Sequence, residues 1–91
     1  MSGEASQEVL ITNRRGLHAR ASAKFVTLAS ALPAQVTVSK DGCSVTGSSI
    51  MGLMMLGAAM GDSITIAASG DGHKEALEQL VALVEGKFGE D

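Results

Sequence analysis

The chain has 91 residues, a net charge of −3 and two aromatic residues, Phe25 and Phe88. This length predicts one small globular domain that spans residues 1–91. The negative charge and the absence of Trp and Tyr argue against a nucleic-acid-binding protein that uses phosphate contacts or base stacking. The single cysteine, Cys43, rules out an intramolecular disulfide and suits a reducing compartment.

The sequence shows no sign of secretion or of membrane insertion. The first six residues lack the basic and apolar regions of a signal peptide. The longest apolar run, residues 50–61, is well short of the roughly 18–20 residues that span a bilayer. We therefore expect a cytoplasmic protein.

Residues 7–12 alternate in part between polar and apolar side chains, which predicts a strand. Residues 13–16 form a loop. Residues 19–32 then place apolar side chains at helical spacing, which predicts an amphipathic helix that ends before Pro33.

A hairpin is predicted next. Residues 35–40 alternate with a period of two, Asp41 and Gly42 have the composition of a two-residue turn, and residues 43–46 form the returning strand.

Three further elements complete the chain. Residues 49–56 form a short helix with Ser48 and Ser49 as candidate caps, residues 63–68 a strand, and residues 72–88 a last helix. The order β-α-β-β-α-β-α and the half-apolar strands predict an α+β fold, an open-faced β-sandwich. In it, a four-stranded, mainly antiparallel sheet carries three helices on its apolar face.

The charges are unevenly distributed. Residues 9–40 contain five basic side chains and no acidic one, whereas residues 71–91 contain six acidic and two basic side chains. Such an asymmetry gives a small domain a directed electrostatic field, although charge runs are more often ordinary solvated surface.

The start of the predicted helix 19–32 departs from the usual capping rules. Backbone N–H groups point outward at a helix start and favour acidic side chains or small oxygen-bearing caps. The last helix has Asp71 and Glu75 there, but residues 14–21 contain no acid and no Ser, Thr, Asp or Asn. Free N–H groups beside added arginines are unfavourable unless an anion binds, so this segment predicts an anion site.

His18 lies at this predicted anion site. A neutral imidazole is a nucleophile near pH 7 and can accept a phosphoryl group on nitrogen. The transferred group would then lie against the helix amides and beside Arg20. A histidine that only packs or caps at a helix end remains an equally weighted alternative.

Two motifs at a fixed separation extend this interpretation. Residues 16–20, Gly-Leu-His-Ala-Arg, and residues 49–57, Ser-Ile-Met-Gly-Leu-Met-Met-Leu-Gly, resemble the histidine-containing phosphocarrier family HPr. The resemblance extends from about residue 7 to residue 88. The chain end, residues 86–91, looks more like the nitrogen-related branch of that family.

The resemblance implies a function and several site residues. His18 would take a phosphoryl group on Nδ1 from phosphorylated Enzyme I and pass it to a histidine of an enzyme IIA protein. Arg20 would stabilise the phosphate, and Ser49 would be the serine that an HPr kinase/phosphorylase modifies in some bacteria. The partner-docking residues would be Ile50, Met51, Met54 and Lys24.

The resemblance also implies a monomer that acts as a relay substrate without a cofactor, not as a stand-alone catalyst. One residue departs from the family motif, because Ala21 stands where the family usually has proline. Alanine frees one backbone donor and loosens the first turn, so we expect altered kinetics but retained transfer.

Other functions remain open at this stage. The chain could be a regulatory module that docks partners without carrying phosphate. A hydrolase that uses Ser48 or Ser49 with His18 is less favoured, because no recognisable motif supplies an acidic partner. Cys43, His18 and His73 lack zinc-ligand spacing, so no metal site is expected.

Overall fold

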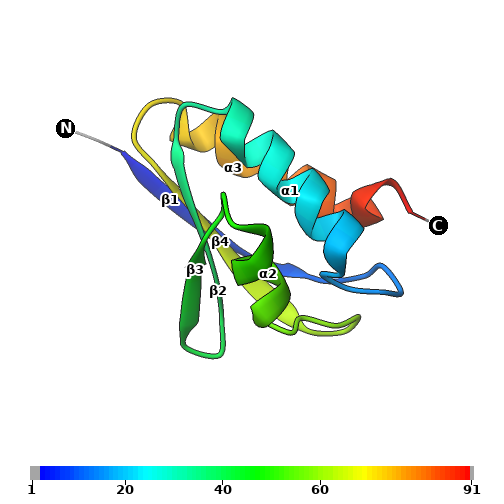
Figure 1. Ribbon diagram of the computed structural model, residues 1–91. Helices are drawn as coiled ribbons and strands as arrows, with labels where there is room; N and C mark the ends of the chain where they lie inside the picture. The colour runs from blue at the N-terminus through cyan, green and yellow to red at the C-terminus, as the bar shows by residue number, and fades with distance from the viewer. Residues whose placement is uncertain (1–2, 91) are drawn as a thin grey trace.

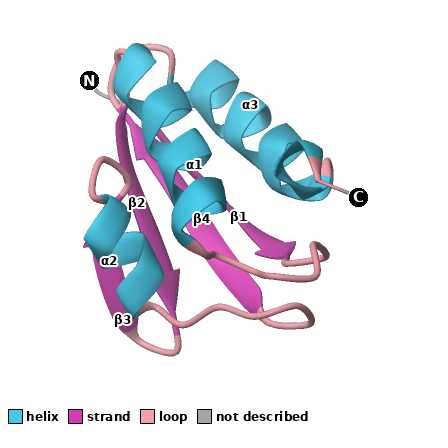
Figure 2. Ribbon diagram, turned by 45° about the vertical axis from the view of Figure 1, so that its right-hand side comes forward, coloured by secondary structure: helices cyan, strands magenta, loops and turns pink. Residues whose placement is uncertain are grey.

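A computed structural model of the chain describes residues 3–90 as an antiparallel sheet covered on one face by helices (Figures 1 and 2). The predicted α+β open-faced β-sandwich is confirmed. Residues 1, 2 and 91 are not described, so Asp91, counted above in the acidic end of the chain, lies outside. In chain order the elements are β1 (Glu4–Leu10), α1 (Ala19–Ala31), β2 (Gln35–Lys40), β3 (Cys43–Thr46), α2 (Ile50–Met55), β4 (Ser63–Ser69), α3 (His73–Glu85) and a 3-10 turn (Lys87–Gly89).

The four strands lie in the order β1-β4-β2-β3, and each neighbouring pair is antiparallel. Lys40 pairs with Cys43 at the end of the predicted hairpin. Asp41 and Gly42 therefore form the predicted two-residue turn, with the positive φ values of 51° and 82° that such turns favour.

The core lies between the sheet and the helices. Alternate residues of the central strands, among them Val38 and Ile66, are buried because they point toward the helices. Phe25 of α1 and Leu80 of α3 are buried against them. Figure 2 shows α1 and α3 side by side over the sheet, with α2 beside the start of α1.

The start of β1 and the end of α3 each differ from the prediction by three residues, and the other boundaries agree to within two. β1 begins at Glu4 instead of residue 7, because pairing with β4 extends to Glu4 opposite Ser69. The last helix ends at Glu85 instead of residue 88.

Beyond this helix the chain turns sharply, since Lys87 and Phe88 both adopt positive φ values, 58° and 55°. Gly72 is the N-cap of α3, and Glu75 lies in its first turn as the sequence indicated. No side chain from the described part of the chain caps this helix by a hydrogen bond.

Candidate functional site

His18 occupies the N-cap position of α1, with extended backbone angles. The first intrahelical hydrogen bond runs from the Ser22 N–H to the His18 carbonyl, at 2.9 Å. The N–H groups of residues 19–21 therefore precede the helical ladder and point outward. Among residues 3–90 no side chain caps α1 by a hydrogen bond, and its first turn holds no acid, as the sequence indicated.

The loop that leads to His18 packs against the loop that follows α2. The Leu17 N–H donates to the Ala58 carbonyl oxygen at 3.0 Å. Gly16 has φ +64°, and a Cβ placed on it would lie 2.3 Å from that same oxygen. Because glycine alone allows this approach, two loops far apart in the chain hold His18 in a fixed position.

A carboxylate from the end of the chain meets His18. Glu90 Oε2 lies 2.5 Å from His18 Nε2, and the two side chains are 20% and 15% exposed. The other carboxylate oxygen, Oε1, accepts a hydrogen bond of 3.1 Å from Asn13 Nδ2. The basic segment 9–40 and the acidic segment 71–91, which are far apart in the sequence, therefore meet at this point.

The buried side chain of Asn13 holds this arrangement together. Its Nδ2 donates to the Gly16 carbonyl at 2.9 Å as well as to Glu90, which uses both of its hydrogens. This double donation fixes the amide orientation, because the flipped amide would face two acceptors with an oxygen. Its Oδ1 has no hydrogen-bond partner among the residues that the structure describes.

The turn after α3 delivers Glu90 to the site. Phe88 is 1% exposed and anchors this turn in the core, while the Lys24 ammonium donates to the Phe88 carbonyl at 2.7 Å. In Figure 1 the red end of the chain accordingly lies beside the start of α1. Lys24, expected at a partner surface, is thus also tied to the C-terminal turn.

The electrostatics of the site favour an ionised Glu90. The Asn13 amide holds the pKa of this carboxyl below its ordinary value, helped by the His18 hydrogen bond and by the charges of His18 and Arg15, against an opposing effect of desolvation. An ionised carboxylate only accepts hydrogen bonds, so His18 Nε2 must carry the proton. In the neutral ring, Nδ1 then keeps its lone pair.

The arginines around His18 are exposed. Within the described range 3–90, Arg20 forms no ion pair closer than 4.0 Å. Its guanidinium group, on the second residue of α1, is therefore available to an anion at the helix start.

The short helix α2 has a capped start, two buried leucines and several exposed apolar side chains. Ser49 is its N-cap, and the Ser49 Oγ accepts a hydrogen bond of 2.9 Å from the Gly52 N–H, whereas Ser48 bonds to Thr46 instead. Leu53 and Leu56 are buried. The exposed apolar side chains of this segment are those of Ile50, Met51, Met54 and Met55.

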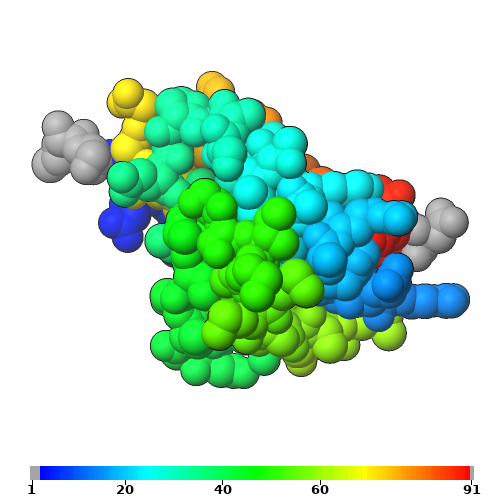
Figure 3. Space-filling model, in the orientation of Figure 1, coloured from blue at the N-terminus to red at the C-terminus, as the bar shows by residue number. Residues whose placement is uncertain are grey.

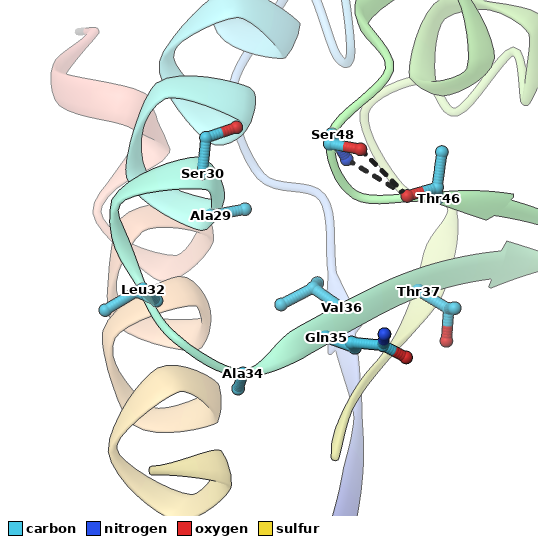
Figure 4. A pocket seen from close by; sticks show the side chains of 9 residues that line it. All are labelled: Ala29, Ser30, Leu32, Ala34, Gln35, Val36, Thr37, Thr46 and Ser48. Atoms are coloured by element: carbon cyan, nitrogen blue, oxygen red, sulfur yellow. Dashed lines mark hydrogen bonds between the residues drawn. The ribbon is translucent and has the colours of Figure 1, made fainter. Parts of the chain in front are cut away.

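These exposed side chains belong to the helix that lies beside the histidine. In Figure 3, α2 in green and the start of α1 in blue and cyan form adjoining parts of one face. A hollow of about 420 Å³ lies elsewhere, between the end of α1, the start of β2 and Thr46 of β3 (Figure 4). None of the predicted phosphocarrier residues lines that hollow, although Ser48, named above for the less favoured hydrolase, does.

Comparison with known proteins places this geometry in a family. A family model described as "PTS HPr component phosphorylation site" matches residues 5–86. The chain belongs to the HPr family. The resemblance seen in the two sequence motifs is thereby confirmed.

Relatives and solved structures agree with this assignment. The phosphocarrier proteins HPr of Neisseria meningitidis serogroup A and of Cupriavidus necator are 48% and 44% identical to the chain over 84 residues, which are 92% of this chain and 94% of each relative. The crystal structure of HPr-C-His from Thermoanaerobacter tengcongensis is similar with a TM-score of 0.91 and 44% identity, covering 96% of this chain and 98% of that one.

Family membership makes the chain a phosphocarrier of the phosphotransferase system, and it implies the partner classes of that system, Enzyme I and enzyme IIA proteins. Across the part of the chain that the structure describes, no helix combines the length and hydropathy required to cross a bilayer.

Proposed function

We propose that His18 is the phosphoryl carrier, which accepts the group on Nδ1 from phosphorylated Enzyme I and passes it to a histidine of an enzyme IIA protein. The observation that carries this proposal is the hydrogen bond between His18 Nε2 and Glu90. Because that bond keeps the proton on Nε2, the lone pair of Nδ1 is left for attack on phosphorus.

The transfer step balances without a cofactor. The Nδ1 lone pair forms the new N–P bond while the N–P bond to the Enzyme I histidine breaks, and that electron pair returns to the donor imidazole. The product ring carries Nε2–H and a phosphoryl group on Nδ1, so it is positively charged until Nε2 loses its proton. Glu90 lies at the nitrogen where this charge develops.

The surroundings suit the transferred group. The N–H groups of residues 19–21 offer donors and the positive end of the α1 dipole, and Arg20 adds a guanidinium group. Phosphoryl transfer depends mostly on positioning and on charge stabilisation, which such a helix start supplies. The chain needs no metal ion or cofactor for this step, and it acts as a relay substrate, not as a stand-alone catalyst.

We propose that both partners dock on one face, defined by Ile50, Met51, Met54 and Lys24 and called the docking face below. Three of these side chains are exposed apolar groups on the helix beside His18. A shared face makes docking of the donor and of the acceptor mutually exclusive, so the carrier meets them one after the other. The proposed carrier is a cytoplasmic monomer with a single domain, residues 1–91.

Ser49 is the proposed regulatory site for an HPr kinase/phosphorylase. Its Oγ caps α2 next to the docking face, and a phosphate on that oxygen would add about two negative charges there. The added charge would weaken docking to an acidic partner surface.

Incubation with Enzyme I and phosphoenolpyruvate, followed by intact-mass measurement, tests the carrier role. We expect an acid-labile gain of one phosphate in the wild type and none in His18→Ala. The chain contains one other histidine, so His73→Ala is the matched control and should gain the phosphate normally.

Failure of the wild type to gain phosphate would contradict the proposal and favour a module that docks partners without carrying phosphate. If the wild type does gain phosphate, offering the phosphorylated protein to sugar-type and nitrogen-type IIA proteins in parallel identifies the branch that it serves. The likeness of residues 86–91 to the nitrogen-related branch favours the nitrogen-type acceptor, and the branch itself stays open until this measurement is made.

A further inference from the structure

Four of the five methionines of the chain lie within residues 51–60. They are unusually accessible for methionine, with exposed fractions of 67% for Met51, 40% for Met54, 78% for Met55 and 57% for Met60. Methionine is normally among the residues found in protein interiors, so a group of exposed methionines requires an explanation.

The four side chains belong to two segments that adjoin the loop of His18. Met51, Met54 and Met55 are three and four positions apart in α2, so they share one side of that helix. Met60 lies in the loop whose Ala58 carbonyl accepts the N–H of Leu17, the residue before His18.

Thioether sulfur reacts with peroxides where solvent reaches it. With hydrogen peroxide, the sulfur takes one oxygen atom: an S–O bond forms, the O–O bond breaks, and water leaves. Sulfur is oxidised by two electrons and the peroxide is reduced by two. The product sulfoxide is polar, so it disturbs apolar contacts at a methionine-rich interface.

We propose that Met51 and Met54 form a reversible oxidation site, at which sulfoxidation by hydrogen peroxide weakens docking of Enzyme I and thereby slows phosphorylation of His18. This inference rests on the proposed function, because it requires the docking face to bind Enzyme I. Methionine sulfoxide reductases, which reduce each sulfoxide epimer, would restore the original side chains.

The fold separates this surface from the core. Leu53 and Leu56 anchor α2 by their buried side chains, and the Ser49 cap holds its first turn. Oxidation of Met51 and Met54 therefore adds polar groups to the exposed part of α2 and leaves the buried side chains of Leu53 and Leu56 unmodified.

Cys43 is exposed as well and is a second target of peroxide. It lies at the β2–β3 hairpin, opposite Lys40, outside the docking face. A Cys43→Ser background removes its contribution. Met1 lies outside the described residues, so oxidation at that position is measured separately.

The experiment compares Cys43→Ser protein before and after treatment with hydrogen peroxide. Peptide mapping by mass spectrometry quantifies the sulfoxide at each methionine, and phosphorylation by Enzyme I and phosphoenolpyruvate gives KM and kcat for the carrier. We expect KM to rise about tenfold or more, as for a polar group left unpaired at an apolar contact, with a smaller change in kcat. Reductase treatment should return KM to its starting value.

Two double variants in the same background locate the effect. Met51→Leu/Met54→Leu keeps the apolar volume but has no sulfur on the docking face, so its KM should not respond to peroxide. Met55→Leu/Met60→Leu is the matched control, which removes two sulfurs from side chains that are on average more exposed and should respond as fully as the parent.

The inference is overturned if KM is unchanged when Met51 and Met54 are shown to be sulfoxides. It is also overturned if peroxide raises the KM of the two double variants equally. A fall in the urea midpoint of the oxidised protein that accounts for the lost activity would overturn it as well. If the untreated protein is not phosphorylated at all, the proposed function fails instead. In that case calorimetry still tests the oxidation site. If untreated and oxidised protein bind Enzyme I with equal affinity, the proposal that sulfoxidation weakens docking is contradicted.

Discussion

His18 and Glu90 are 72 positions apart in the chain and share one hydrogen bond at the start of α1. The helix start lacks an acid of its own, and the carboxylate of Glu90 supplies a negative charge to this positively charged end. The sequence predicted an anion at this helix start, and the Glu90 carboxylate is one such anion, supplied by the protein itself.

At the residue scale, Glu90→Ala should release the proton of His18 from Nε2. Without the carboxylate, the neutral ring distributes between its two tautomers, which lowers the share with a free Nδ1 lone pair. Nitrogen-15 NMR of the imidazole measures this distribution directly. Glu85→Ala, at an exposed site in α3, is the control, and equal tautomer ratios in the two variants would contradict the assigned role of Glu90.

The lowered pKa of Glu90 predicts a stability difference that depends on pH. A carboxyl group whose folded pKa lies below its unfolded value stabilises the fold above the unfolded value, about 4.3 for glutamate. This contribution disappears as the pH falls from about 4.3 through the lower folded pKa.

Urea unfolding of the wild type and of Glu90→Gln from neutral pH down to about pH 2 checks this. The wild type should have the higher midpoint at neutral pH, and the two midpoints should converge in acid. A difference that persists at the lowest pH would show that the carboxylate charge is not its cause.

Arg20→Gln should slow phosphorylation by roughly ten- to a hundredfold, because one charged donor to the phosphoryl group is lost. Its fold should be intact, since the arginine opposes the helix dipole while no phosphate is bound. Quenched time courses of phosphorylation measure the rate of transfer, and urea unfolding measures the stability of the variant. A markedly lower urea midpoint for the variant would contradict the role of Arg20 as a phosphate clamp.

At the scale of elements, α2 depends on its cap because it has only six residues. Ser49→Ala should cost about 1 kcal/mol of unfolding free energy, since the Gly52 N–H loses its acceptor. Ser49→Asp keeps an oxygen cap and should retain most of that stability, yet it places a negative charge beside the docking face.

Urea unfolding and the rate of phosphorylation by Enzyme I separate these effects. Ser49→Ala should be less stable but phosphorylated at a nearly normal rate, and Ser49→Asp should show the reverse. If both variants were phosphorylated equally fast, charge at Ser49 would have no regulatory effect.

At the scale of the whole molecule, the site exists because three distant parts of the chain meet: the loop before α1, the loop after α2 and the turn after α3. The first contact depends on Gly16, where any side chain would meet the Ala58 carbonyl. Gly16→Ala should therefore lower the unfolding free energy by more than about 2 kcal/mol and reduce phosphorylation as well.

Gly42→Ala is the matched control for this prediction. Gly42 also has a positive φ, +82°, but open space around it, so its substitution reports only the backbone cost, about 1 kcal/mol. Urea unfolding of both variants isolates the contact with Ala58, and equal losses of stability would show that this contact is unimportant.

Much of the fold could be predicted because its signals are local. The alternation in residues 35–40, the Asp41–Gly42 turn and the apolar spacing of residues 19–32 each depend on neighbours in the chain. The boundaries at Glu4 and Glu85 could not be predicted, because pairing with Ser69 extends the first strand and the turn at Lys87 ends the last helix.

The sequence by itself determined the class of fold, the uncapped start of the first helix and the candidate histidine, since each is a property of consecutive residues. Only the tertiary structure brought Asn13 and Glu90 to that histidine and assigned the proton to its Nε2. No local pattern could report this contact, because it joins residues 72 positions apart and depends on the burial of Phe88 and on the hydrogen bond from Lys24 to the Phe88 carbonyl. Packing of the C-terminal turn against α1 therefore brings an acidic side chain to the basic segment around His18.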